Sequence, residues 1–246
     1  MRVAVLADIH GNLPALEAVL GDIDAAGADV IVLNGDMATG PMPAETLDRL
    51  AALGDRAVWV RGNADRELVA ACDGELDPAL PDVARIPTEY CASRLERRHR
   101  DLLAGLPLSL TLDVTGLGAV RFCHATTRSD TEIVLVDSPM DRYRAAFADS
   151  AEPTVVLGHT HMPFERLADR RRFVNPGSVG MPYGGTGAYW ALLGPDVVLR
   201  HTGYDGQAAG KLFRAAAPGY PDLGEFIAEN VLTVPSDAVA LAAFSG

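Results

Sequence analysis

Short apolar runs alternate with amphipathic segments in the first quarter of the chain. The apolar runs are rich in β-branched residues, which is typical of buried strands, and they lie at 2–8, 29–36 and 56–65. Two segments with helical periodicity, 12–27 and 43–54, separate them. Strand, helix, strand, helix, strand in this order predicts a parallel sheet with crossover helices.

The first helical segment carries signals at both of its ends. Asn12 has the side chain of an N-cap, Pro14 suits the first turn, and Gly27 suits the residue after a helix. We therefore expect a helix that begins after Asn12 and ends before Gly27.

Residues 66–106 contain no strand pattern. Within them, 88–106 has helical periodicity and many arginines, and we expect one long amphipathic helix whose charges face solvent. We interpret 66–106 as a helical insertion that lies over or beside the functional site and narrows access to it.

The second half of the chain returns to strands. Alternating residues at 108–125 with a turn at 115–118 predict a hairpin, and the first residue of 138–150 would cap a helix there. Further strand patterns follow at 153–161, 164–178, 187–194 and 196–203. From about Gln207 the pattern is helical. Together these elements predict one α/β domain over residues 1–246, with a two-sheet core and a helical C-terminal tail.

The composition is that of a soluble globular protein, and its charge limits the expected partners. Hydrophobic residues make up 48% and charged residues 22%, and the formal net charge is −12. A generic binder of nucleic acid or of anionic membranes needs a basic surface, so we expect neither partner. A small phosphorylated substrate is compatible with an acidic chain when the site supplies its own positive charge, and a homo-oligomer is left open.

The cysteines and the N-terminus bear on cellular location. Cys72, Cys91 and Cys123 show no C-x-x-C spacing and are expected to be reduced thiols. The first apolar run is too short for a signal peptide and meets a carboxylate at Asp8. Since no stretch approaches the roughly 20 apolar residues of a membrane span, we expect a cytoplasmic protein.

Polar residues with metal-binding chemistry follow several of the predicted strands. Each stands where an apolar run ends, and several come directly after a glycine. They are Asp8, His10, Asp36, Asn63, His124, His159 and His161. Because ligand sites of open α/β sheets lie outside the carboxyl ends of the strands, we expect all of them at one edge.

His159 and His161, in the stretch LGHTHMPF, are two residues apart. On an extended segment this spacing turns both imidazoles to the same side, where they can bind a cation. Two loop histidines facing water explain the stretch equally well on its own. Asp8 alone would more often be a cap and Asn63 alone a turn former, but the combined pattern favours a metal site.

The donor types restrict the metal. Imidazole nitrogen with carboxylate oxygen suits Mn, Fe, Co, Ni or Zn. Two cations in one cleft repel each other unless an anion bridges them. Asp36 is central in the order of these residues, and we expect it to be that bridge.

The ordered motifs D-x-H, G-D, G-N, H and G-H-x-H resemble those of the calcineurin-like metallophosphoesterase superfamily. The stretch NPGS at 175–178 resembles its small prokaryotic phosphodiesterase branch. The resemblance implies a four-layer α/β/β/α sandwich of two mixed sheets and a site for two divalent ions, with Mn the first candidate. One ion would be held by Asp8, His10, Asp36 and His161. The other ion would be held by Asp36, Asn63, His124 and His159.

One position departs from the pattern of many superfamily members. They carry a histidine directly after the G-N asparagine, as a proposed proton donor to the leaving group, whereas this chain has Ala64 followed by Asp65. The small prokaryotic branch commonly has this G-N-x-D pattern. Asp65, a metal-bound water and His99 are candidates for the donor, in falling order of preference. We expect Asp36, Asn63 and Asp65 to be the catalytic residues.

Candidates for contact with substrate are Asn12, Arg66 and Asn175, with Arg61 and Arg128 also near motif ends. Solvated charge is the ordinary role of such arginines.

Other residues with reactive side chains have simpler interpretations. His99 and His201 are expected at the surface, and Cys123 as a small buried hydrophobe. The glycine-rich stretch 175–187 either presents amides to a phosphate or is a flexible loop.

These observations predict a dinuclear-metal phosphoesterase. We expect it to hydrolyse phosphodiesters of small substrates, and phosphomonoesters as a further option, by means of a hydroxide that bridges the metals. A nuclease is the alternative within enzymes, and the acidic balance weighs against it. A non-catalytic metal-binding scaffold of the same fold is disfavoured because such relatives usually lack metal ligands that this chain retains.

Overall fold

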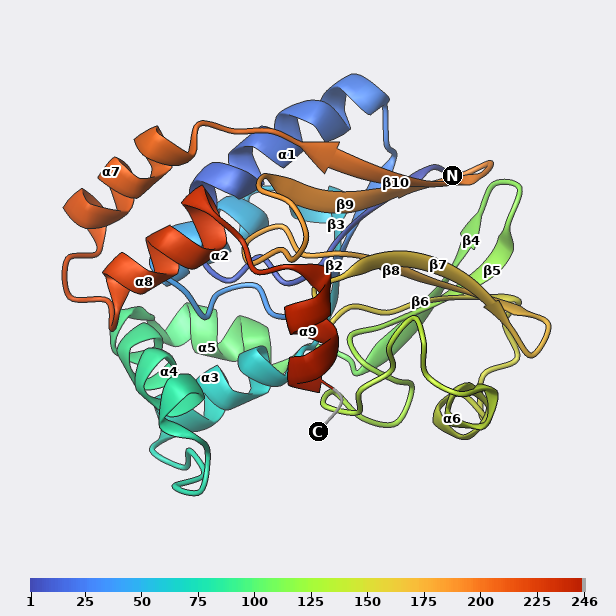
Figure 1. Cartoon of the computed structure of the whole chain (residues 1–246), viewed down its shortest axis with the longest axis horizontal. Coiled ribbons are helices and arrows are strands. Elements are labelled where there is room, and N and C mark those ends of the chain that lie inside the picture. Colours follow the sequence, from blue (N-terminus) through green and yellow to red (C-terminus); the bar gives the residue numbers. More distant parts are fainter. Residues whose placement is uncertain (245–246) are drawn as a thin grey trace.

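The computed structural model describes residues 1–244 and contains two five-stranded sheets (Figure 1). The last two residues of the expected domain lie outside the described part. The first sheet has the order β10-β9-β1-β2-β3, in which β1, β2 and β3 are parallel and β9 is antiparallel to both of its neighbours. The strands are β1 (Val3–Leu6), β2 (Val30–Asn34), β3 (Ala57–Val60), β9 (Ala188–Leu193) and β10 (Val197–Thr202).

The second sheet is also mixed and has the order β4-β5-β6-β8-β7. Strands β5, β6 and β8 are parallel, and β4 and β7 pair antiparallel at its two edges. The strands are β4 (Ser109–Val114), β5 (Gly118–Cys123), β6 (Thr154–Val156), β7 (Pro163–Ala168) and β8 (Arg171–Pro176). The β4–β5 pair confirms the hairpin expected between 108 and 125.

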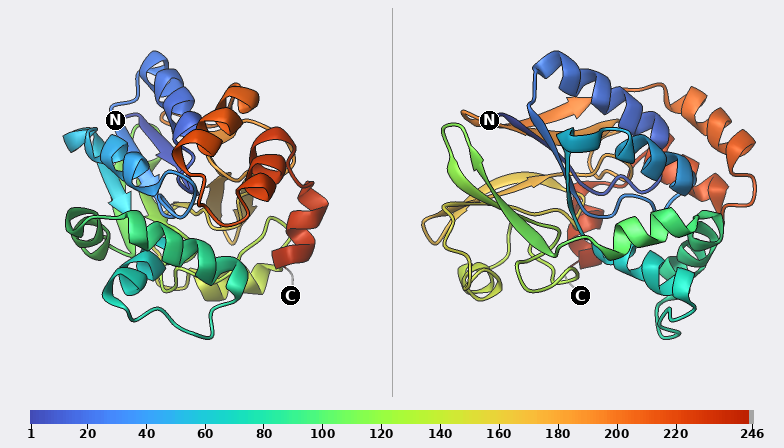
Figure 2. Two further views of the ribbon diagram at one scale, coloured as in Figure 1. Left: turned by 90° about the vertical axis from the view of Figure 1, so that its left-hand side faces the viewer. Right: turned by 180° about the vertical axis from the view of Figure 1, so that it is seen from behind.

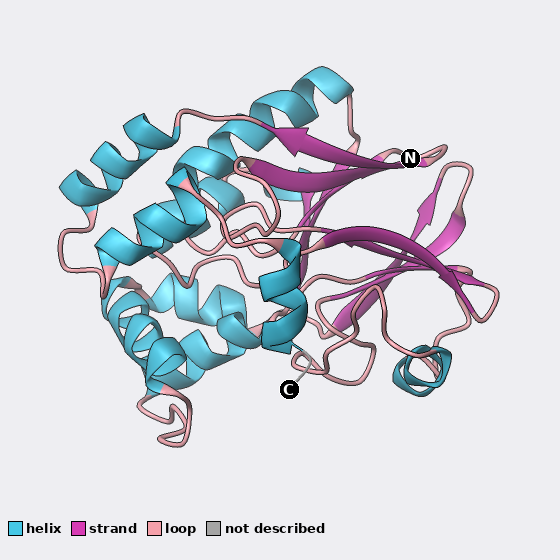
Figure 3. Cartoon of the chain, in the orientation of Figure 1, coloured by secondary structure: helices cyan, strands magenta, loops and turns pink. Residues whose placement is uncertain are grey.

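Alternation along the strands divides the core into layers. In β1, Ala4 and Leu6 pack in the apolar cluster beneath α1 (Leu13–Ala26) and α2 (Pro43–Ala51), whereas Val3 and Val5 pack against the second sheet. A third cluster lies between the second sheet and α6 (Met140–Ala146). Helix, sheet, sheet and helix therefore form four layers, which confirms the expected fold, and Figures 2 and 3 show the strands between the flanking helices.

Helix α1 has the caps that its sequence predicts. The Asn12 side chain accepts a hydrogen bond from the Ala15 N–H at 3.2 Å. Gly27 ends the helix in the left-handed conformation, with φ 67°, which costs glycine less than any other residue because it lacks Cβ.

The long helix expected over 88–106 is two helices in the structure, α4 (Asp82–Arg94) and α5 (Arg97–Ala104). The chain is extended at Glu96, where the His99 Nδ1 accepts the backbone N–H at 3.1 Å. His99 is also 2.9 Å from Asp48 through its Nε2. The expectation of a surface histidine was therefore wrong, because this cap and the contact with Asp48 hold the ring in a buried position.

The predicted cap of the helix near 138–150 also differs. Helix α6 begins at Met140 with Pro139 in the capping position, and the Ser138 hydroxyl instead accepts the Leu135 N–H at 2.9 Å. The hydroxyl accepts a backbone N–H of the preceding turn. A short Ser-Pro-x-Asp pattern fits this turn as well as it fits a helix cap, so the sequence could not distinguish the two.

The segment 66–106 contains α4, α5 and most of α3 (Asn63–Asp73). These helices pack on one another, and Leu68, Cys91 and Leu103 join the cluster beneath α1 and α2. The first turn of α3 also reaches the site described below. That the segment is an insertion and narrows access to the site stays a prediction.

The chain after β10 is mostly helical. Its elements are α7 (Gly206–Ala216), α8 (Leu223–Ile227), a π-helical turn (Ala228–Leu232) and α9 (Asp237–Phe244). One further short element, a 3-10 turn at Gly54–Arg56, precedes β3. Figure 1 shows α9 apart from α7 and α8, near the centre of the view. Within residues 1–244, no helix has both the length and the apolar character needed to cross a bilayer.

Candidate metal centre

The polar residues predicted at strand ends come together where the carboxyl ends of strands from both sheets meet. Asp8, Asp36 and Asn63 follow β1, β2 and β3 of the first sheet, and His124 and His159 follow β5 and β6 of the second. The side chains form two groups, and within each group the donor atoms lie within 4.8 Å of one another. The groups are Asp8 with His10 and His161, and Asp36 with His124 and His159.

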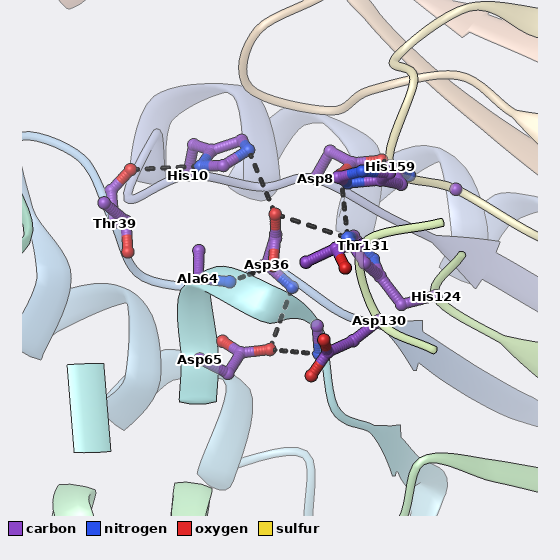
Figure 4. Close-up of polar contacts among 12 residues, drawn as sticks. Asp8, His10, Asp36, Thr39, Ala64, Asp65, His124, Asp130, Thr131 and His159 are labelled. Carbon is purple, nitrogen blue, oxygen red and sulfur yellow. Dashed lines mark hydrogen bonds and ion pairs between the residues drawn. The ribbon is translucent and has the colours of Figure 1, made fainter. Parts of the chain in front are cut away.

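Asp36 lies between His10 and His124, which belong to different groups (Figure 4). Its Oδ2 is 3.8 Å from His10 Nε2 on one side and 3.3 Å from His124 Nε2 on the other. Asp8 Oδ1 is likewise 3.3 Å from His161 Nε2 and 3.9 Å from His124 Nε2. Asp36 and Asp8 thus each contact histidines of both groups, and the bridging role of Asp36 stays a prediction.

Three histidine rings are fixed by backbone carbonyls. The Nδ1–H of His10, His124 and His161 donates to a carbonyl oxygen at 3.1, 2.9 and 2.8 Å respectively. The carbonyls belong to Thr39, Asn34 and Met181. In a neutral imidazole the lone pair is then on Nε2, which faces the centre. Metal-binding histidines are commonly held in this way by a hydrogen bond from their other ring nitrogen.

His10 and His161 bring their Nε2 atoms within 3.2 Å of each other. With both Nδ1 atoms protonated, two lone pairs face each other unless one ring is an imidazolium. A cation between the rings would relieve this conflict.

Several buried donor atoms at the centre have no hydrogen-bond partner within residues 1–244. They are Asp8 Oδ1, Asn63 Oδ1 and His124 Nε2. A buried polar atom without a partner costs about 1–3 kcal/mol, and more when it is charged. Because all of these atoms are metal-ligand types aimed at the same space, the residues fit a metal centre.

The backbone at the centre is in an uncommon conformation. Asp8, His10, Asp36, His159 and His161 have φ between 46° and 66°. For residues other than glycine the left-handed region is costly, and such residues cluster at functional sites. The sharp turn at each strand end aims the side chain back over the sheet edge.

Two glycines allow this crowding. A Cβ on Gly62 would overlap the Asp36 carboxylate, and a Cβ on Gly35 would overlap the His124 ring. The G-D and G-N motifs are therefore explained by close approach of the backbone to ligand side chains.

Burial and mutual charge shift the pKa values of the group in the metal-free protein. Burial alone would raise the pKa of Asp36, but His124 overcomes it and the pKa falls below its usual range. Burial disfavours charge on His124 as well, yet Asp36 and Asp8 raise its pKa to about 10. Burial and the charge of His124 lower the pKa of His159 to about 4. The buried carboxylates of Asp36 and Asp8 thus favour a positive charge beside them, and a proton on His124 supplies one.

Asp65 lies behind the centre, fully buried. Its oxygens accept the N–H groups of Asp36 at 2.9 Å, Gly62 at 2.9 Å and Met37 at 3.1 Å. Burial and the charge of Asp36 raise its pKa to about 7, against the opposing effect of these donors. This placement differs from the expected proton donor, because the carboxylate ties together the loops after β2 and β3. Ala64 donates its N–H to Asp36 Oδ1 at 2.9 Å.

The expected substrate contacts Asn12 and Asn175 are buried, with both amide groups engaged. Asn12 caps α1 and donates to the Gly180 carbonyl at 3.1 Å. Asn175 donates to the Gly158 carbonyl at 2.9 Å. The structure therefore favours support of the neighbouring loops over contact with substrate.

The arginines near the motifs differ in their positions. Arg66 makes a two-point contact with Asp130 at 2.9 and 3.2 Å, and Arg61 Nε is 3.4 Å from the same carboxylate. Arg66 Nη2 is also 3.7 Å from Glu67 Oε1, so the two guanidinium groups face two carboxylates and their charges balance. Arg128 instead pairs with Glu132 in a surface ion pair.

The remaining reactive side chains are away from the donor groups. His201 is exposed and donates to the Thr186 carbonyl at 2.6 Å, and Cys123 is fully buried, as expected. The start of the glycine-rich stretch supports the site, because the Ser178 hydroxyl donates to the Asp8 carbonyl at 2.7 Å.

Sequence reasoning missed three residues around the centre. Asp130 holds the two arginines, and the rings of Tyr183 and Phe244 lie 6.1 Å from those of His161 and His159. None of the three ends a strand or belongs to a motif. Their approach depends on long-range folding, which local patterns do not encode.

Comparison with known proteins agrees with this geometry. Residues 1–196 match the family model "Calcineurin-like phosphoesterase superfamily domain". The chain is 27% identical over 207 residues to phosphodiesterase YfcE of Escherichia coli K12, with 80% of this chain and 90% of YfcE covered.

Solved structures of similar fold include a metallophosphoesterase from Sphaerobacter thermophilus, with a TM-score of 0.73, 28% identity and coverage of 94% of this chain and 99% of the other. A hypothetical protein from Pyrococcus horikoshii, PH1004, has a TM-score of 0.77 at 22% identity, over 92% and 96% of the two chains. With its matched motifs and fold, this chain belongs to the calcineurin-like phosphoesterase superfamily and is a phosphoric ester hydrolase.

Proposed function

We propose that this protein is a phosphodiesterase that acts on small substrates and requires two divalent metal ions. The observation that carries the proposal is the pair of donor groups joined at Asp36, with imidazole Nε2 atoms and buried carboxylate oxygens aimed at the same space. The name of the relative YfcE supports the preference for diesters.

Each donor group would hold one ion. Asp8, His10 and His161 would bind the first, and Asn63, His124 and His159 the second, with Asp36 shared by both. The mixed nitrogen and oxygen set suits Mn, our first candidate, and also Fe, Co, Ni or Zn. When bound, such ions lower the pKa of water and neutralise phosphoryl oxygens.

The charge balance of the centre favours an anionic substrate. Two divalent ions bring four positive charges and the carboxylates of Asp8 and Asp36 two negative ones, so the centre would have a net charge of +2. Arg61 and Arg66 lie beside it, held by Asp130, and Arg66 also contacts Glu67. A positive centre attracts a small anion. The chain as a whole has a net charge of −12, which disfavours binding of a polynucleotide.

The protein's own residues have distinct roles in this proposal. Asp36 and Asn63 are catalytic residues because they hold the ions, and Asp65 is a positioning residue that fixes both of their loops. Arg66, which Asp130 holds through Nε and Nη2, is the proposed substrate contact. With alanine at position 64, no imidazole follows Asn63 to protonate the leaving group.

The test combines metal analysis with turnover. We expect purified protein loaded with Mn to contain about two ions per chain and to cleave an aryl phosphodiester faster than plasmid DNA or RNA. His124→Ala and His161→Ala should each reduce the metal content to about one ion. Degradation of plasmid or RNA in preference to small diesters would favour a nuclease, and metal binding without any turnover would favour a scaffold.

A further inference from the structure

The rim of the metal centre carries an aromatic pair from distant parts of the chain. The Phe244 ring centroid is 6.1 Å from that of His159, and the Tyr183 centroid is 6.1 Å from that of His161. The two aromatic rings are 6.3 Å apart and nearly perpendicular, at 83°. Phe244 lies outside the 1–196 stretch that matches the superfamily model, whereas Tyr183 lies within it.

Packing fixes the position of Phe244. In α9, Ala240 is fully buried and packs with Leu135 and Met162, and Met162 directly follows the metal-site residue His161. Phe244, one turn after Ala240, is therefore placed over the histidines by the helix. The Gly184 N–H donates to the Pro235 carbonyl at 2.9 Å and ties the entry of α9 to the loop that carries Tyr183.

A pocket of about 530 Å³ lies on the side chain of Phe244. Ile133, Leu135, Pro139 and Phe244 give it an apolar part, and its other lining residues are polar: Thr131, Glu132, Asp137, Ser138 and Arg142. Pockets of roughly 300–1,000 Å³ with apolar walls and a few polar groups are typical small-molecule sites.

The charges at this pocket balance one another. Glu132 and Asp137 line it, and Glu132 is held by Arg142 at 3.5 Å and by Arg128 at 2.6 Å. Because the cations are engaged with these carboxylates, the lining supplies no net positive charge for a second phosphate. The phosphoryl group belongs at the metal centre, and the pocket suits an uncharged substituent.

We propose that Phe244 and Tyr183, with this pocket, form the subsite for an ester group of the substrate, and that this group is a planar, uncharged aromatic ring such as an aryl group or a nucleobase. This inference rests on the proposed function. Perpendicular or offset rings pack favourably on an aromatic pair, and stacking of bases on aromatic side chains is tolerant of the ring's identity.

The test uses ligands that differ only in the ring. Binding of phenylphosphonate and methylphosphonate to the Mn-loaded protein is measured by calorimetry, without turnover. We expect the phenyl compound to bind about 3- to 10-fold more tightly. Phe244→Ala and Tyr183→Ala should each reduce this preference and leave the affinity for methylphosphonate unchanged. Val239→Ala, at an exposed position of the same helix, is the matched control and should alter neither affinity.

Kinetics provide a second reading. For bis(p-nitrophenyl) phosphate, Phe244→Ala should raise KM about 3- to 10-fold with little change in kcat, because the ring binds ground state and transition state alike. An unchanged phenyl preference in both variants would overturn the subsite. So would a rise in kcat/KM for every ester, because Phe244 would then be an obstruction.

The two proposals fail separately. A phenyl preference that depends on Phe244, found in a protein that hydrolyses no diester, would support the aromatic subsite and remove the proposed phosphodiesterase function. Turnover of diesters without a phenyl preference would support the proposed phosphodiesterase function and remove the aromatic subsite.

Discussion

At the scale of single residues, the centre is organised around Asp36. Its Oδ2 faces His10 and His124, and its Oδ1 accepts the Ala64 N–H. Its own N–H is held by Asp65. The side chain is therefore oriented from several directions before any metal binds, which is the preorganisation that a bridging ligand requires.

Replacement of this carboxylate should remove activity without unfolding the protein. Asp36→Asn keeps the shape but removes the charge that would offset the repulsion of two cations. We expect turnover to fall by more than the roughly 10- to 100-fold that changes outside the ligand shell usually cost. Turnover of an aryl diester and metal content measure this, with circular dichroism as the check on folding. Activity near that of the wild type in a folded variant would contradict a shared-metal centre.

Ala64 determines the expected dependence on the leaving group. Without an imidazole there, aryl diesters with acidic leaving groups should be cleaved far faster than alkyl diesters. Ala64→His should speed only the poor leaving groups, by as much as about 10²- to 10⁴-fold if the imidazole acts as a general acid. Rates across a series of diesters graded by leaving-group pKa measure this.

Ala64→Asn is the matched control, because it adds a polar side chain that cannot donate a proton as an acid. A flat dependence in the wild type, with chemistry rate-limiting, would mean that a proton donor is already present.

At the scale of elements, the centre depends on how two loops are joined. Asp65, in the first turn of α3, binds the N–H groups that follow β2 and precede α3. One carboxylate thus couples the ends of two neighbouring parallel strands. The break between α4 and α5 is a similar case, in which Glu96 and His99 cap a helix where periodicity alone predicts continuity.

Asp65→Asn should weaken both the fold and the centre. The amide nitrogen replaces an acceptor and faces backbone donors, which costs about 1–3 kcal/mol of the free energy of unfolding. Metal affinity or turnover should fall about 10- to 100-fold because the loops carrying Asp36 and Asn63 shift. Chemical denaturation and metal titration measure the two effects.

Asp113→Asn, on the exposed edge strand β4, is the control and should change neither quantity. An Asp65→Asn protein with wild-type stability and metal affinity would remove the positioning role.

At the scale of the whole molecule, the candidate metal centre lies where the two sheets meet. Its donors follow strands of both sheets, and within residues 1–244 Asp8 Oδ1, Asn63 Oδ1 and His124 Nε2 have no hydrogen-bond partner. A metal centre between the sheets should therefore link binding to global stability.

Removal of metal should lower the melting temperature. A ligand that binds only the folded state adds about 2.7 kcal/mol at a concentration 100 times its Kd. We expect EDTA to lower the Tm of the wild type and Mn to restore it. Asp36→Asn should respond much less to either. Superimposable unfolding curves with and without Mn would show that no ion binds the native state tightly.

The sequence alone determined the alternation of strands and helices from β1 to β3 and the candidate metal ligands at the strand ends. Alternation of apolar residues sets which face of a strand is buried, and the helix caps at Asn12 and Gly27 are local signals. The residues at strand ends could be placed at one edge because parallel strands share that edge. Glycines that permit close backbone approach, such as Gly62, mark the same positions.

Only the tertiary structure decided how side chains far apart in sequence meet. The grouping of donors near Asp36, the hydrogen bonds of Asp65 to the amides of Asp36 and Met37, and the packing of α9 that brings Phe244 to His159 all join segments separated by tens of residues or more. Asn12 and Asn175 were expected at the substrate and instead support loops, because a polar residue near a motif has the same sequence signature in either role. Contacts of this kind follow from how the helix and sheet layers pack on one another. The hydrophobic periodicity of a single segment carries no information about that packing.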